Sequence, residues 1–168
     1  MVIHFFCSQH IASVTDTNAS PLGMMNSLLA QLLVQYPDFE ISSHDLADVS
    51  HNTLDSVARL FVKLVAQLPS TVILFCVIDG ISLYEDQVRL AETRKVMHQL
   101  TGLLEERGGP IFKLMLTSAT RIKNPPERLD MDDILVVPKN VPPETHFSSP
   151  KWVNLVGSNL IDPEVGEV

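Results

Sequence analysis

An acid followed by glycine, Asp79-Gly80, ends an apolar run that extends from Val72 to Ile78. Such a run is typical of a buried parallel strand, whose carboxyl end lies at the sheet edge where ligands bind. A carboxylate at that edge can hold magnesium, or its waters, beside the phosphates of a nucleotide. Asp-Gly is also a common turn pair. The spacing alone leaves a metal-binding role and a turn role for Asp79 equally open.

A second polar group ends another β-prone run, Ile111 to Thr117. Ser118 and Arg121 follow that run, and each could approach a phosphate or the water that attacks it. Thr117 and Ser118 can equally be a polar strand end, and Arg121 a solvated loop charge, and taken alone the residues favour this simpler interpretation. These residues are therefore candidates only in combination with Asp79.

The other components of known catalytic sites are missing from the sequence. The phosphate-cradling pattern G-x-x-x-x-G-K-[ST] needs a lysine after a glycine, and none of the seven glycines is followed by lysine. The six histidines include no pair at the i, i+4 spacing of zinc proteases, and there is no G-x-S-x-G or G-x-G-x-x-G pattern. Cys7 and Cys76 lie in apolar runs, so we expect buried, reduced thiols.

Composition excludes two broad classes of partner. With 168 residues, 45% of them apolar, the chain can form one domain with a substantial core. A formal charge of −8 argues against nucleic acid as a partner, because no basic stripe exists to bind phosphates. The longest apolar run is far below the roughly 18 residues of a membrane span, and the first residues lack the features of a secretory signal. We therefore expect no membrane partner and a cytoplasmic location.

Periodicity predicts the elements that must position these residues. Helical spacing of apolar residues predicts helices at 21–36, 54–68 and about 86–107, each with a plausible cap or a proline at its boundary. Apolar runs predict strands at 2–7, 72–78, 111–117 and 134–137. The polar stretch 38–52 is expected to be a connection.

Strands that alternate with helices and are continuously apolar indicate an α/β fold, with a mostly parallel sheet of about four strands covered by helices on both faces. Seven of the eleven prolines lie from Pro125 onward. We therefore expect one domain at 1–137 and an irregular, weakly packed, proline-rich tail at 138–168, with a short helix near 152–160.

Four segments, taken in order, resemble the NACHT-type, nephrocystin-like NTPase domains of fungal STAND proteins, which are large intracellular signalling ATPases. Residues 2–7 are similar to the strand that follows the P-loop helix, and 20–33 to the next helix with its Ser-Leu-Leu-x-Gln-Leu pattern. Residues 76–85 resemble the Walker B strand and turn, and 112–118 the sensor strand that ends in Thr-Ser. The resemblance covers about 2–137 and implies a partial P-loop NTPase-like sandwich.

The resemblance also implies roles for single residues. Asp79 would be the magnesium ligand, and Gly80, Thr117, Ser118 and Arg121 would lie beside the nucleotide, ATP or GTP with Mg²⁺ in a complete family domain. The family's second acidic pair is replaced by Ser82 and Leu83, and its sensor arginine is displaced to Arg121. The family's P-loop strand and helix precede the segment that resembles 2–7. We therefore expect this chain to bind no nucleotide cofactor and to hydrolyse none by itself.

Three functions remain open at this point. The first is a fragment or degenerate paralogue of an intracellular STAND signalling NTPase. The second is a non-catalytic interaction module that pairs with a full-length relative, or with itself, through the sheet edge that a P-loop strand would otherwise occupy. The third, an unrelated small α/β hydrolase, lacks a complete set of catalytic residues.

Overall fold

The computed structural model describes residues 1–12, 15–105, 108–120, 122, 125, 129 and 131–136. The strands are β1 (Val2–Phe6), β2 (Ile73–Asp79) and β3 (Ile111–Leu116). The α-helices are α1 (Pro21–Gln35), α2 (Ser43–Ser50), α3 (Leu54–Gln67) and α4 (Leu90–Gly102), and short 3-10 turns are η1 (Cys7–Gln9), η2 (Ile81–Tyr84), η3 (Leu103–Glu105) and η4 (Met131–Asp133). The chain divides into the units Met1–Asp133 and Ile134–Val168, and all of these elements lie in the first.

The three strands form a parallel sheet in the order β1-β2-β3, which confirms the predicted α/β fold. In the register of this sheet, Phe6 lies opposite Asp79 and Ile78 lies opposite Leu116. The fourth strand predicted at 134–137 is not formed by Ile134–Val136, and Val137 lies outside the described residues. So short an apolar run becomes a strand only where a partner strand supplies its hydrogen bonds.

Two of the three predicted helices, α1 and α3, begin at the predicted residue, and the third does not. Ser20 accepts a hydrogen bond of 3.0 Å from the Gly23 N–H at the start of α1. The third predicted helix was expected from about Asp86, but α4 begins at Leu90. The reason is that the Asp86 carboxylate accepts hydrogen bonds of 2.9 Å from the N–H groups of Val88 and Arg89, which forms a separate turn. No helix in the described part of the chain is long and apolar enough to span a bilayer.

Helix α2 was not predicted, because its segment is polar and buries no residue. A sequence signal for it exists. Ser42 and Asp45 form a capping box, in which each side chain accepts a hydrogen bond from the backbone N–H of the other.

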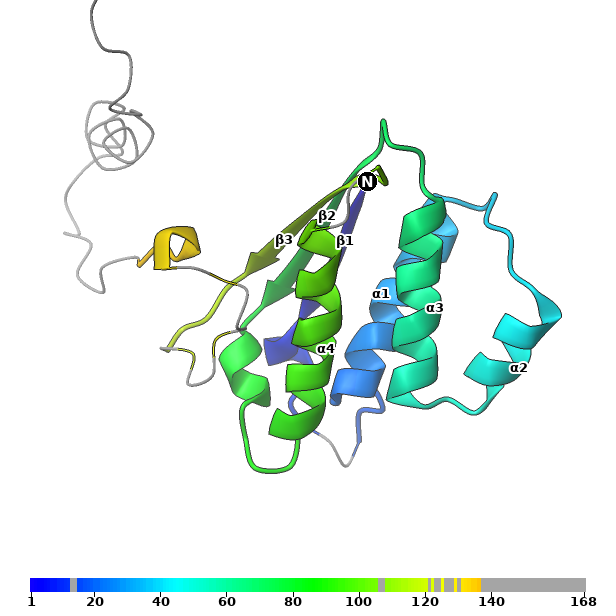
Figure 1. Ribbon diagram of the computed structural model, residues 1–168. Coiled ribbons are helices and arrows are strands. Elements are labelled where there is room, and N and C mark those ends of the chain that lie inside the picture. Colours follow the sequence, from blue (N-terminus) through cyan, green and yellow to red (C-terminus); the bar gives the residue numbers. More distant parts are fainter. Residues whose placement is uncertain are drawn as a thin grey trace, which may run out of the picture. The chain divides into compact units, whose positions relative to one another are not determined.

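One face of the sheet is covered by α1, α3 and α4 (Figure 1). The connection from β1 to β2 and the connection from β2 to β3 both add the next strand in the same direction across the sheet. Right-handed crossovers that run in the same direction place their helices on the same face of the sheet. Alternate strand residues point into this core, namely Ile3, Phe5, Leu74, Cys76, Ile78 and Phe112, and each is at most 6% exposed.

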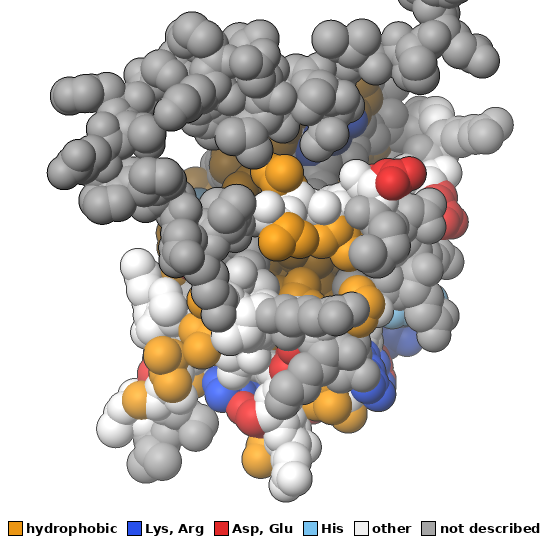
Figure 2. Space-filling view, turned by 90° about the vertical axis from the view of Figure 1, so that its left-hand side faces the viewer, with side chains coloured by type: hydrophobic (Ala, Val, Ile, Leu, Met, Phe, Trp, Pro, Cys, Tyr) orange, Lys and Arg blue, Asp and Glu red, His pale blue; other side chains and the backbone are white. Residues whose placement is uncertain are grey.

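The opposite face of the sheet is apolar and exposed. Its large side chains are 37–56% exposed, and they are Val2, Phe6, Ile73, Phe75, Ile111 and Met115. Figure 2, turned so that the left-hand side of Figure 1 faces the viewer, shows hydrophobic side chains exposed on this side of the molecule. The expectation of helices on both faces is therefore wrong for the described residues. A helix on the second face would need a connection that runs across the sheet in the opposite direction, and none of the described connections does so.

The two edges of the sheet differ. Along β1, the Gln35 amide accepts from the Val2 N–H at 3.2 Å and donates to the Val2 carbonyl at 2.6 Å. Gln31 does the same for His4, at 3.0 and 2.8 Å. These two glutamines of α1 satisfy backbone groups that an edge strand leaves open. Strand β3 pairs with β2 alone among the described strands, so its other edge is open there.

Candidate functional site

Asp79 and Thr117 lie together at the carboxyl edge of the sheet. Asp79 is the last residue of β2, and Thr117 follows β3 directly. The Thr117 hydroxyl donates a hydrogen bond of 2.5 Å to Asp79 Oδ1, and both residues are partly exposed. The structure therefore brings together two residues that the sequence marked as candidates 38 positions apart.

Gly80 holds the turn that follows Asp79. Its φ is +73°, in the left-handed region that favours glycine. Its N–H donates to the hydroxyl and to the carbonyl oxygen of Thr117, both at 3.1 Å. A Cβ at this position would lie 3.4 Å from Leu83 Cδ1, an ordinary contact. The backbone conformation, rather than lack of space, therefore selects glycine here.

The other two candidates are not brought to Asp79 by a described contact. The Ser118 hydroxyl donates to the carbonyl of Thr120, so it serves its own turn. Arg121 lies outside the described residues.

Cys7, next to β1, borders the same edge but offers no nucleophile. Burial, and secondarily the nearby Asp79 carboxylate, raises the pKa of Cys7 to about 12. Burial alone raises the pKa of Cys76 to about 12. Both thiols are free and buried, as expected, and both stay protonated at neutral pH, so neither is activated as a thiolate.

Tyr84 and Arg89, which were not predicted as site residues, hold the turn after Asp79 in place. The Tyr84 hydroxyl donates to the carbonyls of His10 and Asn18, at 3.1 and 3.3 Å. The Arg89 guanidinium stacks 4.5 Å from the centre of the Tyr84 ring and donates from Nε to Asp86 at 2.6 Å. The turn that carries Gly80 is thereby fixed to the loop after β1. A tyrosine and an arginine five positions apart carry no sequence signal for this contact.

The carboxyl edge of the sheet can supply one magnesium ligand, but it does not hold enough ligands to bind the ion by itself. Magnesium at a nucleotide takes one or two carboxylates, and phosphate and water oxygens complete its octahedron. Thr117 engages Oδ1 of Asp79, so Oδ2 is the oxygen that could coordinate the ion. Within the described residues there is no group of three or more His, Cys, Asp or Glu placed to hold a metal. Asp79 could therefore supply one ligand to a magnesium ion, whose other ligands would have to come from elsewhere.

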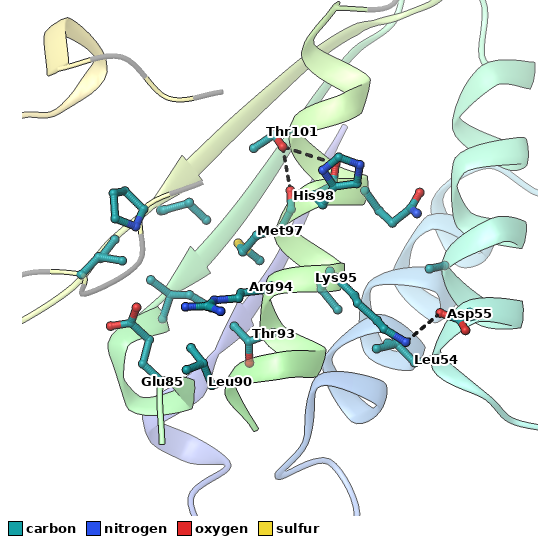
Figure 3. Close-up of a pocket in the computed structure, with 17 residues that line it drawn as sticks. Leu54, Asp55, Glu85, Leu90, Thr93, Arg94, Lys95, Met97, His98 and Thr101 are labelled. Atoms are coloured by element: carbon teal, nitrogen blue, oxygen red, sulfur yellow. Dashed lines mark hydrogen bonds and ion pairs between the residues drawn. The ribbon is translucent and has the colours of Figure 1, made fainter. Parts of the chain in front are cut away.

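A cavity of about 840 Å³ lies beside α4 rather than at Asp79. Figure 3 shows Glu85 and Arg94 on one side of α4, and Lys95 reaching toward Asp55 on the other, at 3.7 Å. Asp79 and Thr117 do not line it. The cavity and the candidate site are therefore separate features.

Comparison with known protein families shows to which family this chain belongs. The family described as nephrocystin 3, N-terminal, matches residues 1–119. The chain belongs to this nephrocystin 3 N-terminal family. The match runs from β1 through β3 and includes Asp79, Gly80, Thr117 and Ser118, so the resemblance noted in the sequence is confirmed at the level of the family. No curated protein and no solved structure matches the chain significantly.

Proposed function

We propose that this nephrocystin-like domain carries the magnesium and sensor half of the nucleotide site of a cytoplasmic STAND-type signalling NTPase. In this proposal the chain is a fragment or a degenerate paralogue of such a protein and hydrolyses no nucleotide alone. The observation that supports it best is the hydrogen bond between Thr117 and Asp79. It joins the two strand ends that, by the resemblance, correspond to Walker B and the sensor.

Each residue has a role in this proposal. In a complete site, Asp79 would contribute a carboxylate oxygen to the magnesium ion of ATP or GTP. Thr117 orients that carboxylate, and Gly80 allows the turn in which its N–H bonds to Thr117. Ser118 and Arg121 would lie near the phosphates. Magnesium, when bound, neutralises phosphate charge, and the chain's own contribution is to position the acid that holds it.

Two components that a hydrolytic site needs are missing from the sequence, which explains why the chain alone should be inactive. A phosphate cradle needs a nest of backbone N–H groups and a lysine on the β- and γ-phosphates, and the sequence has no lysine after a glycine. The positions where the family carries a second acidic pair hold Ser82 and Leu83, so no carboxylate is placed there to orient the attacking water.

Phosphate release tests this proposal. The chain is incubated with ATP or GTP and magnesium, next to Asp79→Ala and a blank without protein. We expect release from both proteins to equal the blank. Release above the blank that disappears in Asp79→Ala would show a working site and overturn the proposal.

A second candidate function is an interaction module that pairs with a full-length relative. It is favoured by the exposed apolar face and by the open edge of β3. By strand alternation, the polar members of that face are His4, Lys113 and, at the carboxyl edge, Asp79. So large an apolar surface usually marks a binding site. The family match leaves the unrelated hydrolase without support.

Self-association and dye binding test the module. We expect light scattering to show association, and a dye for apolar surface to bind. Both signals should fall in Phe75→Ser on the open face, which is 46% exposed. They should persist in Val34→Ser on α1, which is 83% exposed and lies elsewhere. A monodisperse monomer with low dye binding would count against this function.

A further inference from the structure

Helix α2 is attached to the domain differently from the other helices. It buries none of its residues, whereas α1 and α3 bury most of their apolar positions. Figure 1 shows α2 beyond α3, outside the layer that covers the sheet. Val49 alone of its apolar side chains packs against the core, and Leu46 is 59% exposed. Apolar burial therefore does little to hold α2 in place.

Charges hold α2 to α3 instead. Lys63 Nζ lies 2.6 Å from Asp45 Oδ2, and Arg59 Nη2 lies 2.9 Å from Asp48 Oδ2. The basic side chains are 49% exposed for Lys63 and 70% for Arg59, and their acidic partners are 15% exposed for Asp45 and 34% for Asp48. Pairs this accessible to water are weak and are screened by salt, since the Debye length falls from about 10 Å at 0.1 M to about 3 Å at 1 M.

The contact between these helices is also loosely packed. A groove of about 360 Å³ that is open to solvent runs between them, lined by polar groups of both, by Val49 and by Leu60. On the α3 side it reaches Ser56 and Leu60, which are 1% and 6% exposed. Dispersion contacts are lost wherever such a space separates two surfaces. The ion pairs thus carry a large share of the attachment.

Two anchors bound the segment that includes α2. On one side, the Gln67 amide accepts from the Glu40 N–H at 2.9 Å and donates to the Glu40 carbonyl at 3.0 Å. On the other side, Asn52 has a φ of +47° and accepts from the Asn26 side chain at 3.1 Å. Next to Glu40, Ile41 packs partly against the core, so only residues 42–51 can leave α3 without pulling on the sheet.

We propose that residues 42–51 form a flap held by charges, which opens from α3 when the Asp45–Lys63 and Asp48–Arg59 pairs are screened or removed. Opening uncovers the strip of α3 around Ser56 and Leu60 while the core stays folded. The device is independent of the nucleotide site.

Millisecond hydrogen exchange followed by mass spectrometry tests the flap on the full chain. Exchange of the amides at 43–50 is compared at 20 mM and 1 M NaCl, and in Lys63→Gln at 20 mM. Two exposed pairs each contribute at most a few-fold to an equilibrium constant, so we expect about fivefold faster exchange in 1 M salt and a smaller rise in Lys63→Gln. The amides of α3 should not change.

Lys95→Gln is the matched control. Lys95 pairs with Asp55 at 3.7 Å and has no contact with α2, so its loss removes the same charge from another place. We expect it to leave exchange at 43–50 unchanged. Three results would overturn the flap: no salt effect at 43–50, an equal rise in Lys95→Gln, or exchange in α3 that rises together with that in α2.

Discussion

The hydroxyl of Thr117 donates a hydrogen bond of 2.5 Å to the carboxylate of Asp79, and this bond joins the carboxyl ends of β2 and β3. The same hydroxyl accepts from the Gly80 N–H at 3.1 Å. One side chain therefore fixes both the direction of the acid and the turn behind it. This arrangement is the physical basis for assigning Asp79 and Thr117 to one site.

Replacing Thr117 with valine should destabilise the domain. The substitution keeps the shape of the side chain but removes a donor to a carboxylate and an acceptor for Gly80. Hydrogen bonds to charged groups contribute about 1.5–3 kcal/mol, and partial exposure places the expected loss near 1.5 kcal/mol. Urea unfolding measures it. Thr120→Val, at an exposed position, is the control and should stay within about 0.5 kcal/mol of the parent. Equal stability of the two variants would contradict the assignment.

Gly23 should tolerate no side chain. A Cβ there would lie 2.4 Å from Asn18 Cα, a backbone atom of the loop that leads into α1. Overpacking of this kind costs about 1–3 kcal/mol, so we expect Gly23→Ala to lower the free energy of unfolding by that amount. Gly109→Ala is the matched control, because nothing lies within 4 Å of its Cβ position. A Gly23→Ala variant as stable as Gly109→Ala would show that the loop yields without cost.

Much of this fold could be predicted from the sequence, for identifiable reasons. Long apolar periodicity, the cap at Ser20 and the helix-ending Pro37 and Pro69 predicted α1 and α3, because these signals are local. Asp79 and Thr117 could be paired because parallel strands end at the same edge. Periodicity predicted that α4 begins at about Asp86. In the structure the Asp86 side chain accepts hydrogen bonds from the N–H groups of the predicted first turn, so that turn is separate from the helix.

What could not be predicted depends on contacts between distant segments. The clamp of Arg89 on Tyr84 is tertiary, and the uncovered sheet face follows from the direction of the connections. A continuously apolar strand has the same sequence whether its second face is covered or not.

The glutamines that cap β1 should protect the chain from association at that edge. Gln31→Leu with Gln35→Leu removes four hydrogen bonds to the β1 backbone and leaves its N–H and carbonyl groups open. We expect a larger associated fraction in light scattering. Gln87→Leu with Gln99→Leu, at two exposed positions outside the strands, adds the same number of leucines without touching a strand. Association that is equal in the two variants would mean that apolar surface alone, and not the open edge, is responsible.

Acid should weaken the loop that Tyr84 holds. His10 Nδ1 lies 2.7 Å from Asp16 Oδ2. The hydrogen bond from His10, and secondarily the one from the Asn18 N–H, lowers the pKa of Asp16. Because the folded pKa is the lower one, Asp16 contributes stability above the unfolded value of about 3.9, and this stability is lost as the pH falls through the folded pKa. Unfolding followed between pH 2.5 and 5 should show a shallower acid slope in Asp16→Asn than in the parent. Asp38→Asn serves as control, and an unchanged slope in Asp16→Asn would contradict the role of the pair.

Calorimetry with ATP and magnesium tests most directly whether this chain holds one half of a nucleotide site without the cradle. The parent and Asp79→Ala are titrated at the same concentrations, and circular dichroism confirms that both are folded. The account predicts no binding of submillimolar affinity by either protein. Submillimolar binding by the parent that is lost in Asp79→Ala would contradict it.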